Sequence, residues 1–314
     1  MADPQYPDVL LWAIPFFILC IGLELVWLKY HPIKNAYTFK DARTSLIMGV
    51  GSTISDLLLK VLLVGSLFWV WQFRFFDLGS SIWVILLALV LTDFVYYLIH
   101  YTYHKSRWFW ATHIVHHSSE HYNLTTALRQ QWTNGISGTV LFKFPLVLLG
   151  IHPAIIVFVM AINLIYQFWI HTETIHKMPK WFEAVMNTPS HHRVHHGRNA
   201  RYLDCNYAGI FIIWDRMFGT FVPELPDEKV DYGIVKPITT YNPFKVAFAE
   251  FFAIAKDVFS KGLTPKQRFK YLFAAPGYSH DGSRQKVAQI KADYIKENPE
   301  QAGTPGLPEI IHKN

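Results

Sequence analysis

Eight of the sixteen histidines in this chain fall into three short groups, in which neighbours are adjacent or three or four residues apart. Residues three and four positions apart share one face of a helix, so each group is expected to aim two or three imidazoles at one spot. Neutral imidazole binds iron, zinc, copper and nickel. We call the groups the first, second and third histidine boxes: His100 and His104; His113, His116 and His117; and His192, His195 and His196.

Eight imidazoles are more than one tetrahedral ion takes, because a structural zinc has four protein ligands and a catalytic zinc usually three. Two ions that share the set, each with an open coordination position, fit the number better. The alternative is that the histidines are hydrogen-bonded core residues, but so many clustered imidazoles without metal would leave buried polar groups without partners. The sequence therefore predicts a dinuclear metal centre.

Other histidines in the same part of the chain are weaker candidates for ligands. His171 is expected as a ninth ligand, because it ends an apolar stretch that should return to the side of the boxes. His191 adjoins the third box but points about 100° away on a helix, so we do not expect it to bind. His121 and His176 are weaker candidates still.

A pair of ions that is held by histidines alone and is accessible to oxygen suits attack on an unactivated C–H bond, if the metal is iron. Zinc has no redox chemistry, so two zinc ions would indicate hydrolysis instead, and the spacing leaves both open. Inserting one oxygen atom from dioxygen consumes two electrons beyond those of the C–H bond. The chain has no complete Gly-x-Gly-x-x-Gly loop and no haem or iron–sulfur motif. The reductant is therefore expected to be a diffusible cofactor or a partner protein.

The chain is 51% hydrophobic and only 17% charged, which is too apolar for an ordinary soluble domain. Residues 9–28, 45–71 and 82–99 approach the ~20 apolar residues that a membrane-spanning helix needs. Residues 138–170 are expected to form a helical hairpin that turns at 150–153. The first arm is short, so whether it crosses the whole membrane stays open. No basic residue precedes the first stretch, so it should be an anchor rather than a cleaved signal.

The connection between the first two apolar stretches is basic. It carries Lys29, Lys34, Lys40 and Arg43 against Asp41 alone. The positive-inside rule places this connection in the cytoplasm and the N-terminus outside. The third stretch then ends on the cytoplasmic side with the first box, so the site should face the cytoplasm in a bacterial inner membrane or an endoplasmic reticulum.

These observations predict an all-α, integral-membrane helical bundle with a cytoplasmic histidine-rich cap. Within the C-terminal part, 242–260 is expected to form an amphipathic helix that either lies on the membrane surface and covers the site or packs against the core. The net charge of +6 does not indicate nucleic acid, since the basic residues are scattered and no recognition motif accompanies them. The expected segments are N-terminal membrane helices (1–80), a catalytic domain with the boxes (81–222), an interfacial amphipathic region (223–281) and a mobile polar tail (282–314).

Metal-bound histidines usually donate their second N–H to a carboxylate or a carbonyl oxygen. Four acidic residues lie close enough to the boxes in the sequence to serve in this way. They are Glu120, Glu173, Asp204 and Asp215.

The boxes and their flanks resemble the fatty acid hydroxylase or sterol desaturase superfamily of integral-membrane di-iron enzymes. Within it, the run from His113 to Gln130, His-Ile-Val-His-His-Ser-Ser-Glu-His-Tyr-Asn-Leu-Thr-Thr-Ala-Leu-Arg-Gln, is similar to the alkylglycerol monooxygenases. The resemblance extends over about residues 15–278. The other matching stretches are 166–173, 187–199, 206–209 and 214–220.

The resemblance implies two iron ions on the eight box histidines and a tetrahydrobiopterin-dependent hydroxylation of the ether-linked carbon of alkylglycerols. The hemiacetal product would fall apart to a fatty aldehyde and a glycerol derivative. Glu120, Asn123 and Glu173 lie in matching stretches, which implies catalytic or substrate-binding roles, and Arg129 is implied as a cofactor-binding residue. Lys105 departs from the pattern, because an acidic residue is expected after the first box.

Two other classes of function remain open. A relative in the same superfamily would hydroxylate or desaturate a fatty acyl chain, a sterol or a carotenoid with another electron donor. A membrane metal-binding or transport protein is the alternative that is not an enzyme, although transport sites lie near the bilayer midplane, whereas the boxes lie beyond the ends of the apolar stretches. The expected partners of the leading interpretation are a membrane lipid, dioxygen, and a diffusible pterin or an electron-donor protein.

Overall fold

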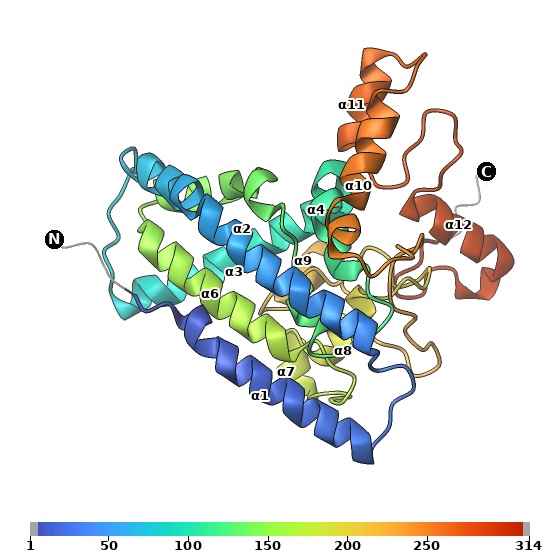
Figure 1. Ribbon diagram of the computed structural model, residues 1–314, viewed down its shortest axis with the longest axis horizontal. Helices are drawn as coiled ribbons and strands as arrows, with labels where there is room; N and C mark the ends of the chain where they lie inside the picture. The colour runs from blue at the N-terminus through green and yellow to red at the C-terminus, as the bar shows by residue number, and fades with distance from the viewer. Residues whose placement is uncertain (1–5, 310–314) are drawn as a thin grey trace.

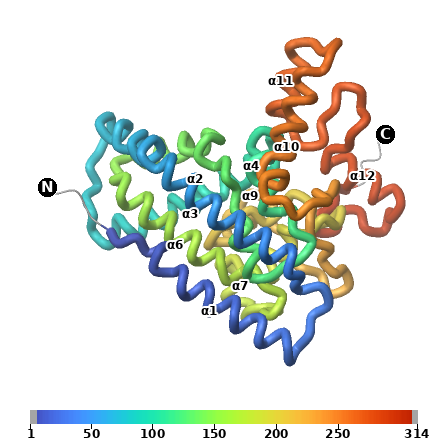
Figure 2. Tube along the Cα trace, viewed as in Figure 1, coloured from blue at the N-terminus to red at the C-terminus, as the bar shows by residue number. Residues whose placement is uncertain are grey.

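The computed structural model describes residues 6–309, and these residues form helices and loops without a β-strand (Figures 1 and 2). Three long helices come first: α1 (Val9–Tyr30), α2 (Phe39–Trp71) and α3 (Ile82–Lys105). Each is long and apolar enough to cross a membrane, and only 11% of the most apolar window of α2 is buried in the protein. Apolar side chains exposed over such lengths mark a membrane protein. The all-α fold class with membrane helices is confirmed.

The boundaries of the long helices differ from the predicted ones at the ends that carry polar residues. Helix α2 begins at Phe39, six residues before the predicted start at 45, and α3 runs through the first box to Lys105. Polar side chains at the end of an apolar helix do not stop it, because helix ends are set by capping and packing rather than by hydropathy. The first box is thus carried out of the apolar segment on a continuous helix.

The predicted helical hairpin over 138–170 is confirmed. Its first arm consists of a 3-10 helix (Thr139–Lys143) and α5 (Phe144–Leu148), and its second arm is α6 (Pro153–Trp169). The turn reaches the connection between α2 and α3, because the N–H of Phe75 donates to Leu148 O at 2.8 Å. A 3-10 helix rises about 2.0 Å per residue against 1.5 Å for an α-helix, which lengthens the short first arm.

The opposite end of the bundle holds short helices that surround the boxes: α4 (Arg107–His117), α7 (Lys180–Val185), α8 (Pro189–His195) and α9 (Ile213–Phe218). One carboxylate on α3 anchors the loop before α9. Asp93 accepts hydrogen bonds from the backbone N–H groups of Ile210 and Phe211 at 2.7 and 3.1 Å, and from the Trp214 indole at 2.9 Å. A buried carboxylate with several N–H donors fixes the loop firmly against the helix.

Helix α10 (Pro243–Val258) confirms the predicted amphipathic helix, with Asn242 as its N-cap. Val246, Ala247 and Ile254 are buried in the protein, whereas Phe244, Phe252 and Phe259 are exposed. The helix packs against α2 and α4 on one side and is followed by α11 (Pro265–Phe273). Figure 1 shows these two helices projecting from the bundle across the direction of the long helices. Core packing therefore accounts for one face of α10, and the exposed phenylalanines are left for a second contact.

Within the described residues 282–309, the segment that was expected to be a mobile polar tail contains helical structure. Residues Val287–Glu297 form α12, followed by a 3-10 helix (Pro299–Gln301). Arg201 holds the segment through hydrogen bonds from its guanidinium to Thr304 Oγ1 and Pro305 O, at 2.6 and 2.9 Å. The segment docks through these charged hydrogen bonds and through the buried side chains of Ile295 and Leu307.

Candidate metal centre

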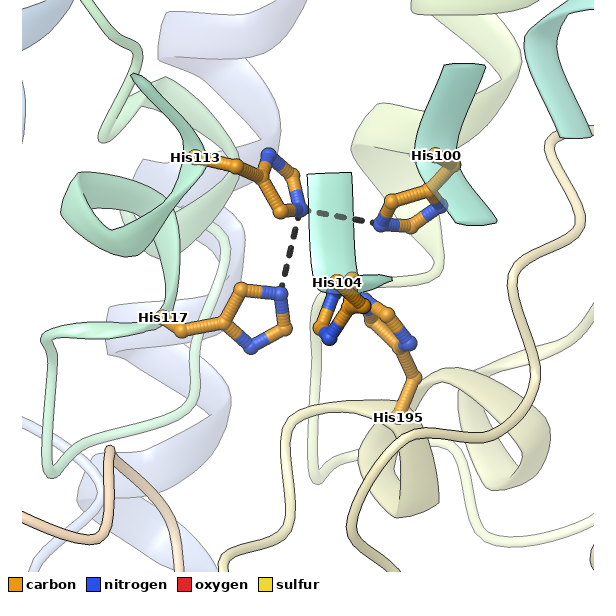
Figure 3. Close-up of side chains that lie close together, drawn as sticks. All are labelled: His100, His104, His113, His117 and His195. Atoms are coloured by element: carbon orange, nitrogen blue, oxygen red, sulfur yellow. Dashed lines mark hydrogen bonds between the residues drawn. The ribbon is translucent and has the colours of Figure 1, made fainter. Parts of the chain in front are cut away.

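The nine histidines named as ligands from the sequence lie together in two buried groups, and within each group the potential ligand atoms lie within 4.8 Å of one another. Figure 3 shows the larger group, in which side chains from α3, α4 and α8 converge. The five-histidine group consists of His100, His104, His113, His117 and His195; the four-histidine group consists of His116, His171, His192 and His196.

The boxes do not each point at one spot, so that expectation is corrected. Histidines four residues apart stay together: His113 and His117 belong to the five-histidine group, and His192 and His196 to the four-histidine group. In the second and third boxes the remaining member, His116 or His195, turns to the other group, because neighbouring positions on a helix point about 100° apart. The second and third boxes thus contribute to both groups.

In the four-histidine group, hydrogen bonds leave the Nε2 atoms of His116 and His171 without protons. The Nδ1 atom of His171 donates to Gln167 O at 2.7 Å, and that of His116 donates to Arg129 O at 3.4 Å. In a neutral imidazole whose Nδ1 carries the proton, Nε2 is a lone-pair acceptor. The two Nε2 atoms nevertheless lie 3.1 Å apart. Two acceptors that face each other at this distance repel unless a cation lies between the lone pairs.

The five-histidine group holds two of its rings in the same way. The Nδ1 atoms of His100 and His195 donate to the carbonyl oxygens of Tyr207 and Cys205, each at 2.8 Å. The Nε2 atom of His100 then faces that of His113 at 2.9 Å, and the buried Nε2 atom of His195 has no hydrogen-bond partner. Buried nitrogen lone pairs without a donor are costly. The residues present therefore fit a metal ion in each group.

Burial keeps these imidazoles neutral. Burial, followed by the neighbouring histidines, lowers the pKa of His113 and His117 well below its ordinary value, and burial lowers that of His171 to about 3. Proton sharing between facing rings is thus disfavoured, which leaves a metal ion as the cation that suits neutral imidazole.

The two groups touch each other. The rings of His117 and His196 stack with centroids 4.5 Å apart, and those of His192 and His195 stack at 5.1 Å. Each of these pairs joins a member of one group to a member of the other. Two metal ions held here would therefore be close neighbours, as a dinuclear centre requires.

Of the four carboxylates expected to orient the histidines, one contacts a ring. Asp204 Oδ1 lies 3.4 Å from His104 Nδ1, and its other oxygen accepts from Lys105 Nζ at 2.7 Å. Although burial opposes ionisation, the hydrogen bond from His104 and the charge and hydrogen bond of Lys105 hold the pKa of Asp204 at about 2. Lys105 therefore supports the first box through Asp204, at the position where an acidic residue was expected.

Asp215 acts through the backbone rather than on a ring. It accepts hydrogen bonds from the N–H groups of Tyr207 and Ala208, both at 2.8 Å, and so fixes the carbonyl that receives the His100 proton. Glu120 and Glu173 contact no histidine ring among the described residues. Glu120 pairs with Arg198 at 2.9 Å, and Glu173 accepts from the Tyr232 hydroxyl at 3.2 Å.

Asn123 and Arg129 bind other groups of the chain itself. The Asn123 amide donates to Ala36 O at 2.6 Å and accepts from the Thr125 N–H at 3.0 Å, which ties the segment after the second box to the connection before α2. The Arg129 guanidinium is buried against Asp41 at 3.0 Å. These placements argue for positioning roles and give no support to a catalytic role for Asn123 or a cofactor contact by the Arg129 side chain.

His191, His121 and His176 lie outside both groups, as expected. His191 faces Glu183 at 4.0 Å, and the His121 ring hydrogen-bonds to Asn35 O at 2.6 Å. Sequence reasoning missed the aromatic residues around the groups. Tyr103 stacks on His113 with centroids 4.8 Å apart, and Tyr122 lies 5.2 Å from His196. Tyr122 lies in a quoted matching stretch, which was the one available signal for it; Tyr103 had none.

A family model described as fatty acid hydroxylase matches residues 85–220. This range includes all nine histidines of the two groups. Residues 85–220 are therefore similar to a fatty acid hydroxylase domain, as the boxes indicated.

Within that family, the chain is similar to alkylglycerol monooxygenases. It is 42% identical to the human protein over 278 residues, which is 87% of this chain and 61% of that protein. It is 38% identical to the Xenopus tropicalis protein over 309 residues, which is 95% of this chain and 66% of that protein. A more distant relative is an ornithine lipid hydroxylase of Rhizobium tropici, 25% identical over 48% of this chain and 45% of that protein.

The chain spans about half to two thirds of the length of the alkylglycerol monooxygenases that it matches. No solved structure matches it.

Proposed function

We propose that this chain is a membrane di-iron monooxygenase that hydroxylates the ether-linked carbon of alkylglycerols. The observation that carries the proposal is the pair of buried histidine groups, in which the facing Nε2 atoms of His116 and His171 need a cation and the buried Nε2 atom of His195 has no hydrogen-bond partner. The fatty acid hydroxylase domain and the similarity to alkylglycerol monooxygenases support the choice of reaction.

The proposed reaction balances with a tetrahydropterin as electron donor. One oxygen atom of dioxygen enters the C–H bond and the other leaves as water, while the tetrahydropterin loses two electrons and two protons and becomes a dihydropterin. The hydroxylated carbon then carries both a hydroxyl and the ether oxygen. This hemiacetal breaks its bond to the glycerol oxygen and gives a fatty aldehyde and a free glycerol hydroxyl.

The chain contributes the ligands and their orientation. Iron ions held by the two groups would supply the binding and reduction of dioxygen. His100, His195, His116 and His171 are fixed by carbonyl oxygens that receive their Nδ1 protons, so their Nε2 atoms are presented without rearrangement. The nine histidines of the two groups are buried in the protein, which excludes bulk water from the centre.

The placement of the groups at one end of the long helices suits a lipid substrate. The first box continues α3 beyond its apolar segment, so a lipid in the bilayer and a polar reductant in water approach the site from two sides. We further propose a multi-pass membrane protein whose basic connection, with Lys29 and Lys34, lies in the cytoplasm. The hydrogen bond from the Asn123 side-chain amide to Ala36 O supports placing the boxes on the same side of the membrane as that connection.

The test is metal content and substrate-dependent turnover of detergent-purified protein. With a 1-O-alkylglycerol, dioxygen and tetrahydrobiopterin, we expect about two irons per chain and aldehyde release in step with pterin oxidation. Protein that holds iron but shows no pterin-linked turnover would contradict the proposed electron donor. Turnover with another lipid in place of the alkylglycerol would contradict the proposed substrate. Activity that depends on zinc alone would overturn the redox reaction.

A further inference from the structure

A pocket of about 390 Å³ lies between α7, α8, α9 and the segment that follows α9. Its size falls at the lower end of the range for pockets that hold small ligands. None of the nine histidines of the two groups lines it, so the pocket is separate from the candidate metal centre. Its charged lining residues are Lys177, Lys180, Glu183, Arg216 and Glu224.

The three strong cations of the pocket, on its two lysines and its arginine, make no ion pair among the described residues. Lys177 Nζ donates to a neutral acceptor, Glu224 O, at 3.1 Å. The Arg216 guanidinium donates to Glu183 O at 3.1 Å and lies over the Phe221 ring, with its Cζ atom 3.8 Å from the centroid. A guanidinium has five N–H donors, so most donors of this group are open to a ligand.

The two carboxylates of the pocket are engaged by other groups of the protein. Glu224 accepts hydrogen bonds from Nε and Nη2 of Arg193, at 2.8 and 2.7 Å. Glu183 Oε1 accepts from the Ser190 hydroxyl at 2.8 Å and from the Met178 N–H at 3.0 Å. Because Arg193 neutralises Glu224, three cations face the single remaining carboxylate, and this balance favours an anionic ligand.

The helices around the pocket lie where the membrane helices leave their apolar segments. Helix α9 packs against that part of α3, because the Phe218 ring stacks on the Tyr97 ring with centroids 5.4 Å apart. The loop between α7 and α8 is tied to the last turns of α6, since the Tyr166 hydroxyl donates to Asn187 O at 2.6 Å. The ends of apolar segments mark the depth of the lipid headgroups.

Exposed apolar side chains adjoin the basic ones. Trp181 follows Lys180 and is 75% exposed, and Met217 follows Arg216 and is 67% exposed. Tryptophan is enriched at the membrane–water interface. A molecule that joins a phosphate to acyl chains can use both the cations and these apolar side chains, whereas a free phosphate can use only the cations.

We propose that this pocket binds the phosphate group of an anionic phospholipid, whose acyl chains lie against Trp181 and Met217. Arginine and lysine bind phosphate through charge-assisted hydrogen bonds, and basic pockets at the ends of membrane helices bind anionic headgroups. The inference goes beyond the proposed function, because the lipid is a bound component of the protein and not a substrate. The pocket also includes Ser190 and His191 of α8, so the bound lipid stabilises the packing of α8 against α7 and α9.

The test is thermal unfolding of the iron-loaded full chain, freed of lipid and held at one detergent concentration. The probes are dioctanoyl phosphatidylglycerol, which is anionic, dioctanoyl phosphatidylcholine, which has no net charge, and inorganic phosphate. A ligand that binds only the folded protein raises the unfolding midpoint as its concentration increases. We expect phosphatidylglycerol to act at a lower concentration than either other probe. Equal responses to the two lipids would overturn the preference for an anionic headgroup, and inorganic phosphate as effective as phosphatidylglycerol would overturn the lipid as the ligand.

Variants with exposed substitutions locate the binding in the pocket. Lys177→Gln combined with Lys180→Gln removes two cations, so the phosphatidylglycerol concentration for half of the full shift should rise by about tenfold or more. Lys236→Gln combined with Lys261→Gln removes two exposed cations elsewhere and should respond as the wild type does. Each shift is measured from the variant's own lipid-free midpoint. A pocket variant that responds as this control does would overturn the site.

Trp181→Ala separates a lipid from a free phosphate. It should weaken the response to phosphatidylglycerol and leave the response to inorganic phosphate as in the wild type, because the cations remain. An unchanged response to phosphatidylglycerol would overturn the placement of the acyl chains. None of these measurements uses turnover, so a failure of lipid binding and a failure of alkylglycerol hydroxylation are distinguishable.

Discussion

The Nε2 atoms of His116 and His171 face each other at 3.1 Å, although the Nδ1 atom of each ring is directed at a backbone carbonyl oxygen. The carbonyls fix the tautomers, so both inner nitrogens carry lone pairs. These two residues are 55 positions apart in the sequence: His116 lies on α4, and His171 lies in the loop directly after α6. A cation between them removes the repulsion, and this makes metal binding part of the fold as well as of the chemistry.

Removal of a ligand from either group should abolish turnover. We expect His116→Ala and His195→Ala both to lose activity, because each leaves a gap among ligands that otherwise converge, and we expect His116→Ala, which leaves only three imidazoles in its group, to lose metal as well. Both variants should still be found in the membrane, since the long apolar helices are untouched. Metal analysis and turnover of membrane-extracted protein give the measurement. The exposed His176→Ala is the matched control and should keep both, and retained turnover in either ligand variant would contradict the dinuclear centre.

The two groups should differ in their tolerance of ligand loss. His171→Ala leaves three imidazoles in its group, whereas His104→Ala leaves four in the other. We therefore expect iron to fall from about two to about one per chain in His171→Ala and to stay near two in His104→Ala, with weaker binding. Iron analysis after dialysis measures this. Equal losses in the two variants would show that the groups do not bind independently.

Metal-free protein should be unstable in mild acid. Burial first, and then neighbouring histidines, lowers the pKa of His113, His117 and His192, and burial lowers that of His171 to about 3. Unfolded histidines titrate near 6.5, so below that pH the unfolded chain binds protons that the folded chain excludes. Stability present above about pH 6.5 should fall as the pH drops from there toward 3.

Thermal unfolding of chelator-treated protein from pH 8 to pH 5 measures this loss. The iron-loaded protein should show a smaller decline over the same range, because bound metal competes with protons for the same nitrogens. A flat profile for the metal-free protein would mean that the imidazoles are not held neutral by the fold.

The elements and the ligand set could be predicted from the sequence because each has a periodic or compositional signal. Long apolar runs predicted the membrane helices, and a spacing of four residues predicted that His113 and His117 share one face of a helix. The division of the boxes between two groups had no such signal, because it depends on how α4 and α8 face each other across the site. The carbonyl oxygens of Gln167 and Arg129 had none either, since every residue carries a carbonyl.

The roles of polar side chains near the boxes were the least predictable. Arg129 and Asp41 are 88 positions apart in the sequence but form a buried pair at 3.0 Å. The sequence offered no way to see that this arginine is neutralised within the protein. Glu173, by contrast, keeps acceptor capacity and lines a pocket. Proximity to a motif in sequence therefore did not separate a residue that supports the site from one that is open to a ligand.

The hairpin turn between α5 and α6 gives a test of the fold away from the metal centre. Gly150 has φ +95°, and a Cβ atom there would lie 2.3 Å from the carbonyl oxygen of Phe76. Gly150→Ala should therefore destabilise the protein by about 1–3 kcal/mol, through strain and displacement of the connection between α2 and α3. Gly65→Ala is the control, because a Cβ atom there meets nothing within 4 Å and alanine favours the helix. Thermal unfolding in detergent should show a lower midpoint for Gly150→Ala alone, and equal midpoints would mean that the turn does not reach that connection.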